Sequence, residues 1–415
     1  MAVILAYGSP ALGHLLPVGA LLAELAGRGH EVHARTMADG VATMRAVGVH
    51  AEPVDAAIEA IAGEDWRAPN ALGVLKSTID VLCRRAVLEV SDLRRAVDTV
   101  RPDAVIVDAN CWGAMSAAEA GHTPWLVFSP FTPYLRSRGV PPFGPGFRPL
   151  PGILGDIRDA SVRPIVRHLF DRPMLPRVNA IRAELGVSPV ASVDDFMRRA
   201  PLLLAVGGEP FEYPHPGWGG LVHHIGACAF EPTTAAPAWV AAIKRPVVLV
   251  NTSSIRQADA ALGRIALRAL ADEPVHVVAT FPAGIPPDLP RAPNATICRF
   301  VPHAAVLERA SCAITHGGMG TTLKALDRGV PVCVVPFARD QAEVARRVEV
   351  ARCGTRLAAR NLTPTRLRTK VRAAMTMADG ARRVAAGFAA TGGVPGGADL
   401  IEQRVLGSAA RRPVR

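Results

Sequence analysis

Short apolar runs alternate with longer stretches of helical periodicity at the start of the chain. Residues 3–6 are apolar and lead into a Gly-Ser-Pro turn, and residues 15–26 then repeat apolar side chains at helical spacing. Residues 31–35 have the pattern of a second strand, and residues 41–47 are again helical. This order of strand, helix, strand and helix predicts parallel strands joined by crossover helices.

The same alternation returns later in the chain. Strand patterns at 104–107 and 125–128 flank a helical pattern at 114–120, and a second block of this kind runs from residue 245 to residue 335. Short, fully apolar strands suit a sheet that is covered on both faces. The pattern therefore predicts an α/β fold with two doubly wound, Rossmann-like domains and a cleft between them, where ligands bind at the carboxyl ends of the strands.

Stretches rich in glycine and proline interrupt the pattern at 139–152 and 213–237. A loop as long as the first one is usually functional, and the second one separates the two alternating blocks. We predict a first domain over residues 1–212, a linker over 213–240, a second domain over 241–390 and a terminal segment over 391–415. The helical pattern in that last segment could belong to either domain.

Composition narrows the class of protein. A chain of 415 residues with 49% hydrophobic and 20% charged residues has ample core and is not intrinsically disordered. Its net charge of +11 is scattered and only 5% of its residues are aromatic, which argues against binding of nucleic acid. No apolar run is long enough to span a membrane. The seven cysteines include no C-x-x-C pair, so we expect reduced thiols in a cytoplasmic protein.

A glycine-rich turn is the strongest local signal. It follows an apolar strand, opens a helix and includes His316, Gly317, Gly318, Gly320 and Thr321. Glycines allow close approach of the backbone, and the N-terminus of a helix favours an anion such as a diphosphate. The alternative is a glycine-rich turn that binds nothing.

Two further stretches lie beside this turn in the second domain. Asp340 and Gln341 follow a strand and suit a ligand with adjacent hydroxyls, or Asp340 simply caps the next helix. Phe300, Val301 and His303 end the previous strand, where an aromatic ring and a stiff turn suit a planar base. The alternative there is a turn with a core phenylalanine.

His14 is the candidate base in the first domain. The loop before it has the spacing of a phosphate-binding P-loop, but His14 replaces the lysine and Leu15 replaces the serine or threonine, which excludes an ATPase of that kind. At a strand end that faces a cleft, His14 can act as a general base, although a solvent-exposed histidine is the alternative. Asp108 ends a later strand and is the better partner, because Asp103 lies at the opposite end of that strand. No D-x-D element is evident, so we predict chemistry without a metal.

Taken together, these motifs resemble the inverting, nucleotide-sugar-dependent glycosyltransferases of the GT-B fold, in particular the bacterial branch that modifies natural products. The likeness is most specific over residues 300–354, where H-G-G-x-G-T, P-F-A-R-D-Q and A-R-R-V-E-V-A-R-C-G follow in the family's order. The resemblance implies an inverting transfer of a sugar to a hydrophobic small-molecule acceptor, with a nucleotide-sugar as co-substrate and no other cofactor. It also implies that the last helix crosses back to the first domain.

The resemblance also implies roles for the candidate residues. His14 looks like the base that deprotonates the acceptor hydroxyl, with Asp108 as its partner, and Asp340 and Gln341 resemble the pair that holds the donor sugar. Phe300, Val301 and His303 match the nucleoside positions, and the glycine-rich turn matches the diphosphate site. The residues that follow a strand of the second domain and resemble further phosphate contacts are Thr252, Ser253 and Ser254.

Lys324 departs from the family pattern. Members that use uridine donors often carry a glutamate at this position, which bonds both ribose hydroxyls, whereas a lysine cannot accept a hydrogen bond. A thymidine donor has one hydroxyl fewer, so we favour dTDP-sugars, among them deoxysugars, over UDP-sugars. A contact of Lys324 with phosphate is the competing explanation.

Other functions stay open at this point. A lipid glycosyltransferase at a membrane surface, a nucleotide-sugar epimerase and a non-catalytic nucleotide-sugar-binding protein are the alternatives. The sequence does not name the sugar, the acceptor, the atom that is glycosylated or the oligomeric state, for which a homodimer is one candidate.

Overall fold

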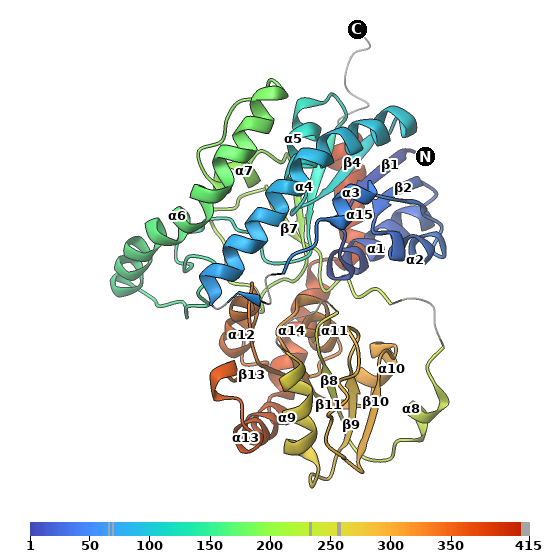
Figure 1. Ribbon diagram of the computed structural model, residues 1–415, viewed down its shortest axis with the longest axis vertical. Coiled ribbons are helices and arrows are strands. Elements are labelled where there is room, and N and C mark those ends of the chain that lie inside the picture. Colours follow the sequence, from blue (N-terminus) through green and yellow to red (C-terminus); the bar gives the residue numbers. More distant parts are fainter. Residues whose placement is uncertain (65–66, 69, 232–234, 255–258, 408–415) are drawn as a thin grey trace.

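Two parallel β-sheets organise the computed structural model, which describes residues 1–64, 67–68, 70–231, 235–254 and 259–407. The first sheet lies in the upper half of Figure 1 and the second in the lower half. The two-domain, doubly wound α/β fold that we predicted is thereby confirmed. No helix in the described ranges is long and apolar enough to cross a membrane.

The first sheet has seven strands in the order β3-β2-β1-β4-β5-β6-β7. Their bounds are β1 (Val3–Tyr7), β2 (Glu31–Thr36), β3 (His50–Pro53), β4 (Ala104–Asp108), β5 (Trp125–Ser129), β6 (Leu203–Ala205) and β7 (Val222–His224). Every residue of β4 and β5 is buried, as the apolar runs predicted. Ala6 pairs with Ile106, so the loops that follow β1 and β4 emerge side by side.

The second sheet has six strands in the order β10-β9-β8-β11-β12-β13. Their bounds are β8 (Val247–Asn251), β9 (His276–Thr280), β10 (Ala295–Cys298), β11 (Ala310–Thr315), β12 (Val332–Val334) and β13 (Gly354–Arg356). Thr315 pairs with Asn251 on one side and with Val334 on the other. The carboxyl ends of three neighbouring strands therefore meet at one edge. Thr252–Ser254, the glycine-rich turn and the Asp340–Gln341 pair follow these ends, whereas Phe300, Val301 and His303 follow β10.

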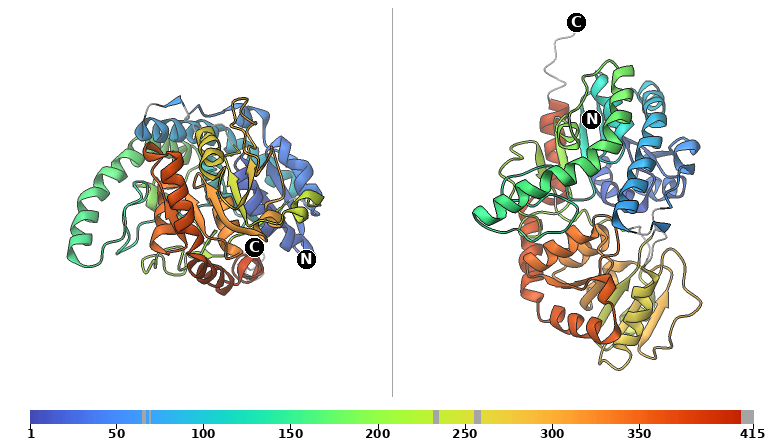
Figure 2. Two further views of the ribbon diagram at one scale, coloured as in Figure 1. Left: turned by 90° about the horizontal axis from the view of Figure 1, so that it is seen from below. Right: turned by 60° about the vertical axis from the view of Figure 1, so that its left-hand side comes forward.

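Helices connect the strands and cover the sheets (Figures 1 and 2). Those of the first half are α1 (Leu12–Gly27), α2 (Val41–Arg45), α3 (Ala56–Ala60), α4 (Ala71–Val100), α5 (Trp112–Ala120), α6 (Ile153–Glu184) and α7 (Val193–Met197). Those that follow are α8 (Ala238–Ala242), α9 (Ala260–Leu270), α10 (His303–Leu307), α11 (Met319–Asp327), α12 (Gln341–Val350), α13 (Pro364–Met375), α14 (Ala378–Ala390) and α15 (Gly393–Leu400). Ala258, where we expected α9 to begin, lies outside the described residues.

Strand β7 lies inside the stretch 213–240 that we predicted as a linker. It is only three residues long and pairs with β6, so part of this stretch extends the first sheet. A strand this short among prolines and glycines carries no periodic signal, which is why the pattern missed it. The division of the chain at residues 212 and 240 stays a prediction.

The end of the chain returns to the first half, as the resemblance implied. Helix α15 packs against α1, and the red ribbon near residue 400 runs among the blue and green elements in Figures 1 and 2. Arg28, which directly follows α1, binds Asp399 at 2.6 Å and Glu402 at 3.0 Å. The segment therefore ties the second half of the chain to the first.

A buried ionic network joins the two halves on the other side. Arg347 of α12 binds Glu212 and Glu343, each at 2.7 Å, and all three side chains are at most 6% exposed. Its guanidinium also lies 4.4 Å from the centre of the Tyr213 ring. Burial alone would raise the pKa of Glu212, but Arg347 and His215 outweigh it and hold that pKa well below its usual range.

The same network holds the glycine-rich loop 139–152 against α12. Glu343 accepts hydrogen bonds from the backbone nitrogens of Gly144 at 2.8 Å and Gly146 at 2.7 Å. A Cβ atom at Gly146 would lie 2.5 Å from the carbonyl oxygen of Ala342, and its φ is +63°. A glycine is therefore required where the loop touches the helix.

We expect Arg347→Ala to lower the free energy of unfolding by roughly 3–5 kcal/mol, because it leaves two buried carboxylates without their counter-ion. Urea unfolding followed by tryptophan fluorescence measures this loss. The exposed Arg366→Ala is the matched control and should change stability by less than about 0.5 kcal/mol. Equal midpoints for the two variants would show that the network does not hold the halves together.

Candidate active site

The ends of strands β1 and β4 bring the predicted base and its partner together. His14 lies in the first turn of α1, and its Nδ1 is 2.8 Å and 3.0 Å from the two carboxylate oxygens of Asp108. Asp108 is buried and His14 is 18% exposed. Because the carboxylate accepts the Nδ1 proton, Nε2 carries the lone pair, and the ring is set up to take a proton from a ligand.

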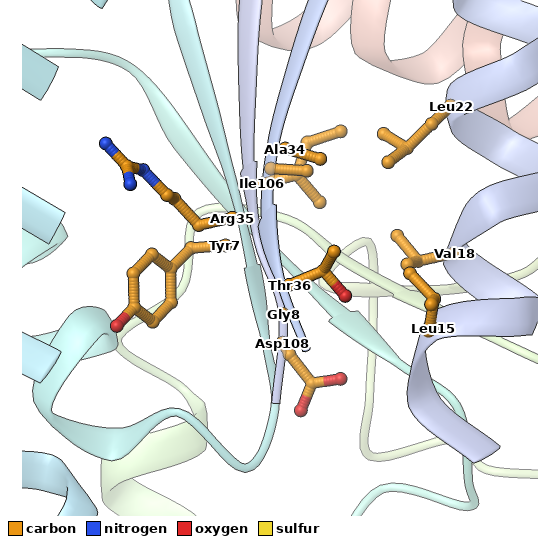
Figure 3. A pocket seen from close by; sticks show the side chains of 11 residues that line it. Tyr7, Gly8, Leu15, Val18, Leu22, Ala34, Arg35, Thr36, Ile106 and Asp108 are labelled. Atoms are coloured by element: carbon orange, nitrogen blue, oxygen red, sulfur yellow. The ribbon is translucent and has the colours of Figure 1, made fainter. Parts of the chain in front are cut away.

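A water-sized cavity lies behind this pair. Its volume is about 10 Å³, and the residues that line it include Leu15, Val18, Thr36 and Asp108. Figure 3 shows Thr36 and Asp108 extending toward α1, whereas Tyr7 points to the other face of the sheet. The buried Thr36 hydroxyl has no hydrogen-bond partner within the described ranges.

Glu89 of α4 fixes the element that follows Asp108. Its carboxylate accepts hydrogen bonds from the backbone nitrogens of Gly113 at 2.9 Å and Ala114 at 3.4 Å, at the start of α5. Burial raises the pKa of Glu89 to about 8. The loop that carries Asp108 is therefore anchored at its far end by a buried carboxyl group.

An aromatic wall stands beside the base. Phe131 meets the His14 ring edge-on at 5.8 Å between ring centres, and Tyr134 stacks on Phe131 at 5.0 Å. Phe143 and Phe170 contact Tyr134 at 5.1 Å and 5.8 Å. Three rings of this wall come from the segment between β5 and α6, including loop 139–152, and Phe170 comes from α6 itself. The wall offers an apolar surface next to His14.

The glycine-rich turn lies at the edge of the second sheet. Gly318 precedes α11, and a Cβ atom there would lie 2.5 Å from Nε2 of His316. The Thr321 hydroxyl accepts a hydrogen bond from the Asn251 amide at 2.8 Å. Burial lowers the pKa of His316 to about 4, so its imidazole is neutral at neutral pH. The backbone nitrogens at the start of α11 and the neutral ring of His316 therefore lie at the same edge of the second sheet. Gly317 lies in the turn before α11, and Gly320 lies in the first turn of this helix.

The small polar residues after β8 lie at this edge as well. Thr252 donates its hydroxyl to the Thr280 carbonyl at 3.2 Å, and the backbone nitrogen of Ser253 donates to Asp259 at 2.6 Å, while Ser254 is exposed. Asp259 also lies 3.8 Å from Nδ1 of His316, and burial raises its pKa to about 6. Sequence reasoning missed Asp259, because nothing in a lone aspartate before a helix indicates a contact with a distant histidine.

Asp340 and Gln341 stand at the start of α12. Asp340 is the N-cap residue of this helix by position, as the alternative expected, but its side chain makes no capping hydrogen bond. The carbonyl oxygen of the Gln341 side chain accepts from the backbone nitrogens of Phe337 at 2.8 Å and Ala338 at 3.0 Å. Burial raises the pKa of Asp340, and its own backbone nitrogen and the charge of Arg339 counter this rise. Loop 139–152 of the first half contacts the same helix, because Gly144 and Gly146 donate to Glu343.

The predicted nucleoside positions differ in exposure. Phe300 is 59% exposed, whereas Val301 is buried and His303 is half-buried. His303 begins α10, and its Nε2 is 3.4 Å from the Thr280 hydroxyl. Burial and the charge of Lys324 lower the pKa of His303 to about 3. An exposed aromatic ring beside a neutral, half-buried imidazole is an arrangement that can stack on a planar base.

Lys324 faces a carboxylate rather than the glycine-rich turn. Its Nζ is 3.4 Å from Glu231, whose two oxygens also accept from the backbone nitrogen of Ala304 at 2.9 Å. Glu231 lies in the stretch predicted as a linker, where the sequence gives no sign of its partner. Within the described ranges, no group of three or more histidine, cysteine, aspartate or glutamate side chains could hold a metal ion.

The chain is similar to known proteins in sequence and in fold. Residues 264–395 match a family model described as the C-terminal domain of erythromycin biosynthesis protein CIII-like proteins. The chain is 28% identical to 4'-demethylrebeccamycin synthase of Lentzea aerocolonigenes, over 96% of this chain and 98% of the relative. It shares its fold with the calicheamicin glycosyltransferase CalG4, with a TM-score of 0.72 and 22% identity over 99% of both chains. The same holds for the glycosyltransferase VinC in complex with dTDP, with a TM-score of 0.67 and 24% identity over 100% of both chains.

Glu89→Gln should change how stability depends on pH. An unfolded glutamate loses its proton near pH 4.3, whereas Glu89 in the fold keeps it up to about pH 8. The contribution of Glu89 to the free energy of unfolding is therefore greatest below about pH 4 and decreases as the pH rises to about 8. Because the glutamine does not ionise, the free energy of unfolding of the variant should rise relative to that of the native protein by up to about 1.4 kcal/mol per pH unit across this window.

Urea unfolding at pH 5, 6, 7 and 8 measures this difference. The exposed Glu184→Gln is the control and should follow the native protein at every pH. A constant difference between Glu89→Gln and the native protein would show that the carboxyl is not held protonated in the fold.

Proposed function

We propose the following reaction for this chain, which is a glycosyltransferase of the GT-B fold related to the enzymes of bacterial natural-product biosynthesis. It moves a sugar from a nucleoside diphosphate to a hydroxyl of a hydrophobic small molecule, with inversion at the anomeric carbon. The observation that carries the proposal is the His14–Asp108 pair, in which Nδ1 of His14 lies 2.8 Å from the carboxylate and Nε2 is left to act on a ligand. A base on one side and sugar-binding groups on the other are what an in-line displacement needs.

The step balances as a single displacement. Nε2 of His14 takes the proton of the acceptor hydroxyl, the oxygen forms a bond to the anomeric carbon, and the bond from that carbon to the phosphate oxygen breaks. The nucleoside diphosphate leaves with the electron pair. Asp108 stabilises the imidazolium that forms, because its carboxylate holds the opposite nitrogen at 2.8 Å.

The leaving diphosphate is assigned to the start of α11. His316, Gly317, Gly318, Gly320 and Thr321 surround this helix end, where backbone N–H groups and the helix dipole favour negative charge. These groups act on the developing charge without a metal ion in our proposal. Thr252, Ser253 and Ser254 supply further donors from the end of β8.

The sugar and the base take the two sides of that helix end. We assign the sugar hydroxyls to Asp340 and Gln341. A carboxylate that does not cap its own helix supports this role. We assign the base to the exposed ring of Phe300, together with Val301 and His303, which follow it in the chain.

A dTDP-sugar is the preferred donor in this proposal. Lys324 cannot accept a hydrogen bond from a ribose hydroxyl, and its ammonium group is engaged by Glu231. Loss of an acceptor costs a deoxyribose less than a ribose, since deoxyribose has one hydroxyl fewer. The VinC structure that shares this fold contains dTDP.

The acceptor is a hydrophobic molecule in this proposal. The aromatic wall of Phe131, Tyr134, Phe143 and Phe170 stands next to His14 and supports this choice. The seven cysteines are all free thiols, which fits the cytoplasmic location that we propose.

One observation favours a lipid acceptor at a membrane surface as a second candidate. Ile153, Leu154 and Ile157 at the start of α6 are 57–75% exposed and share a helix face next to loop 139–152. Cosedimentation with anionic vesicles at low salt separates this candidate from the first one.

Thermal unfolding with dTDP, UDP, GDP and NAD tests the donor assignment. A nucleotide at about 100 times its dissociation constant should stabilise the protein by roughly 2.7 kcal/mol. We expect the largest rise in the unfolding midpoint with dTDP, a smaller one with UDP and none with NAD. An equal or larger rise with UDP would contradict the argument from Lys324, and no rise with either would remove the donor site.

His14→Ala should lower turnover by roughly 10²–10⁴ while the rise in midpoint with dTDP stays as in the native protein. Turnover is followed as dTDP release from dTDP-glucose with a panel of phenolic and macrolactone acceptors. The exposed His168→Ala on α6 is the control. A variant that loses dTDP binding as much as turnover would reject the role of His14 as a base.

A further inference from the structure

Asn110 lies at the nitrogen of His14 that has to receive the proton. Its side-chain nitrogen Nδ2 is 3.5 Å from Nε2 of His14, on the side of the ring away from Asp108. This separation is longer than that of a usual hydrogen bond, so the amide faces the lone pair of Nε2 without blocking it. Neither the motifs nor the resemblance points to this residue.

Two contacts determine which end of the amide faces His14. The backbone nitrogen of Asn110 donates to Asp108 at 2.8 Å, which fixes the main chain. The hydroxyl of Tyr134 donates to the side-chain oxygen Oδ1 at 3.4 Å. With Oδ1 held by Tyr134, the NH₂ end points to the imidazole, and this is the only orientation in which the Nε2 lone pair meets a donor.

We propose that Asn110 contacts the acceptor as a further residue of the reaction centre, donating an amide N–H to the attacking oxygen while His14 takes its proton. Tyr134 is a positioning residue in this proposal, because it holds the amide in the required orientation. The inference rests on the proposed function, since it takes His14 to be the base.

The valence of a hydroxyl oxygen explains why a second contact is needed. The oxygen has one proton and two lone pairs, and the proton goes to Nε2. One lone pair must point to the anomeric carbon, and a donor on the other lone pair helps to hold the rotation about the C–O bond that this alignment requires. An oxygen about 2.8–3.0 Å from both nitrogens fits beside two atoms that are 3.5 Å apart.

The contact also favours the charge that develops in the step. As the proton moves to His14, negative charge builds on the oxygen until its bond to the anomeric carbon is complete. A hydrogen bond from an N–H donor to that oxygen is therefore stronger in the transition state than in the ground state. The proton ends on His14 and the electron pair ends on the diphosphate, so Asn110 itself gains and loses nothing.

Three variants test the proposal: Asn110→Ala, Asn110→Asp and Tyr134→Phe. The reactions are transfer from dTDP-glucose to 2-naphthol and hydrolysis of dTDP-glucose, in which water takes the place of the acceptor. We expect Asn110→Ala to lower kcat/KM for the acceptor by roughly 10- to 100-fold, with kcat affected more than the KM for the donor. The hydrogen bond from the backbone nitrogen of residue 110 to Asp108 does not involve the side chain. The His14–Asp108 pair should therefore stay in place in every variant.

Asn110→Asp separates donation from size. The carboxylate fills the same volume but cannot donate, and its charge opposes the charge on the oxygen, so this variant should be impaired at least as much as Asn110→Ala. A residue that only filled space would tolerate it. Tyr134→Phe keeps the aromatic stacking and should cost about threefold, with no further loss when it is added to Asn110→Ala, because both act through one contact.

The controls distinguish the possible failures. The exposed Asn361→Ala should behave as the native protein, and thermal unfolding of each variant with dTDP reports whether the donor half is intact. If Asn110→Ala and Asn110→Asp both stay within twofold while His14→Ala loses turnover, this inference is overturned and the proposed function stands. If His14→Ala keeps its turnover, both fall together.

Discussion

The buried guanidinium of Arg347 determines how the two halves of the molecule face each other. It belongs to the helix that begins at Asp340, yet it is neutralised by Glu212 of the first half as well as by Glu343 of its own helix. A buried arginine is tolerated only where its charge is paired and its donors are used. The angle of α12 relative to the first sheet is therefore not free, and neither is the position of Asp340 relative to His14.

That constraint couples the two sides of the site. Glu343 also accepts the backbone nitrogens of Gly144 and Gly146, so the loop that we place beside the acceptor is attached to the helix that we assign to the donor sugar. Tyr134 is close to both sides of the site. Burial raises its pKa above the usual range, and the charges of Asp340 and Asp108 raise it further. A change on the donor helix therefore reaches the aromatic wall through short, direct contacts.

Local rules predicted the parts of the site that lie at strand ends. The partnership of His14 with Asp108 followed from two strands whose carboxyl ends share an edge, and the turn at His316 followed from glycines between a strand and a helix. Contacts between segments far apart in the chain had no such signal. Glu212 and Arg347 are separated by 135 positions and Glu231 and Lys324 by 93, and each pair forms only because the halves pack as they do. Asn110 was missed for a related reason, because its role depends on the orientation of a side chain rather than on its place in a motif.

The charge of the chain and the charge of the site are two separate matters. The chain carries a net charge of +11, but the two histidines on the donor side are neutral in the fold, since burial lowers their pKa to about 4 and about 3. Buried charges without partners are costly, whereas the N–H groups of a helix end are already oriented and need no counter-ion. In the reaction that we propose, such dipoles would bind the diphosphate without holding it by net charge, which favours its release after each transfer. The burial of His316 and His303 thus belongs to the same design as the helix end beside them.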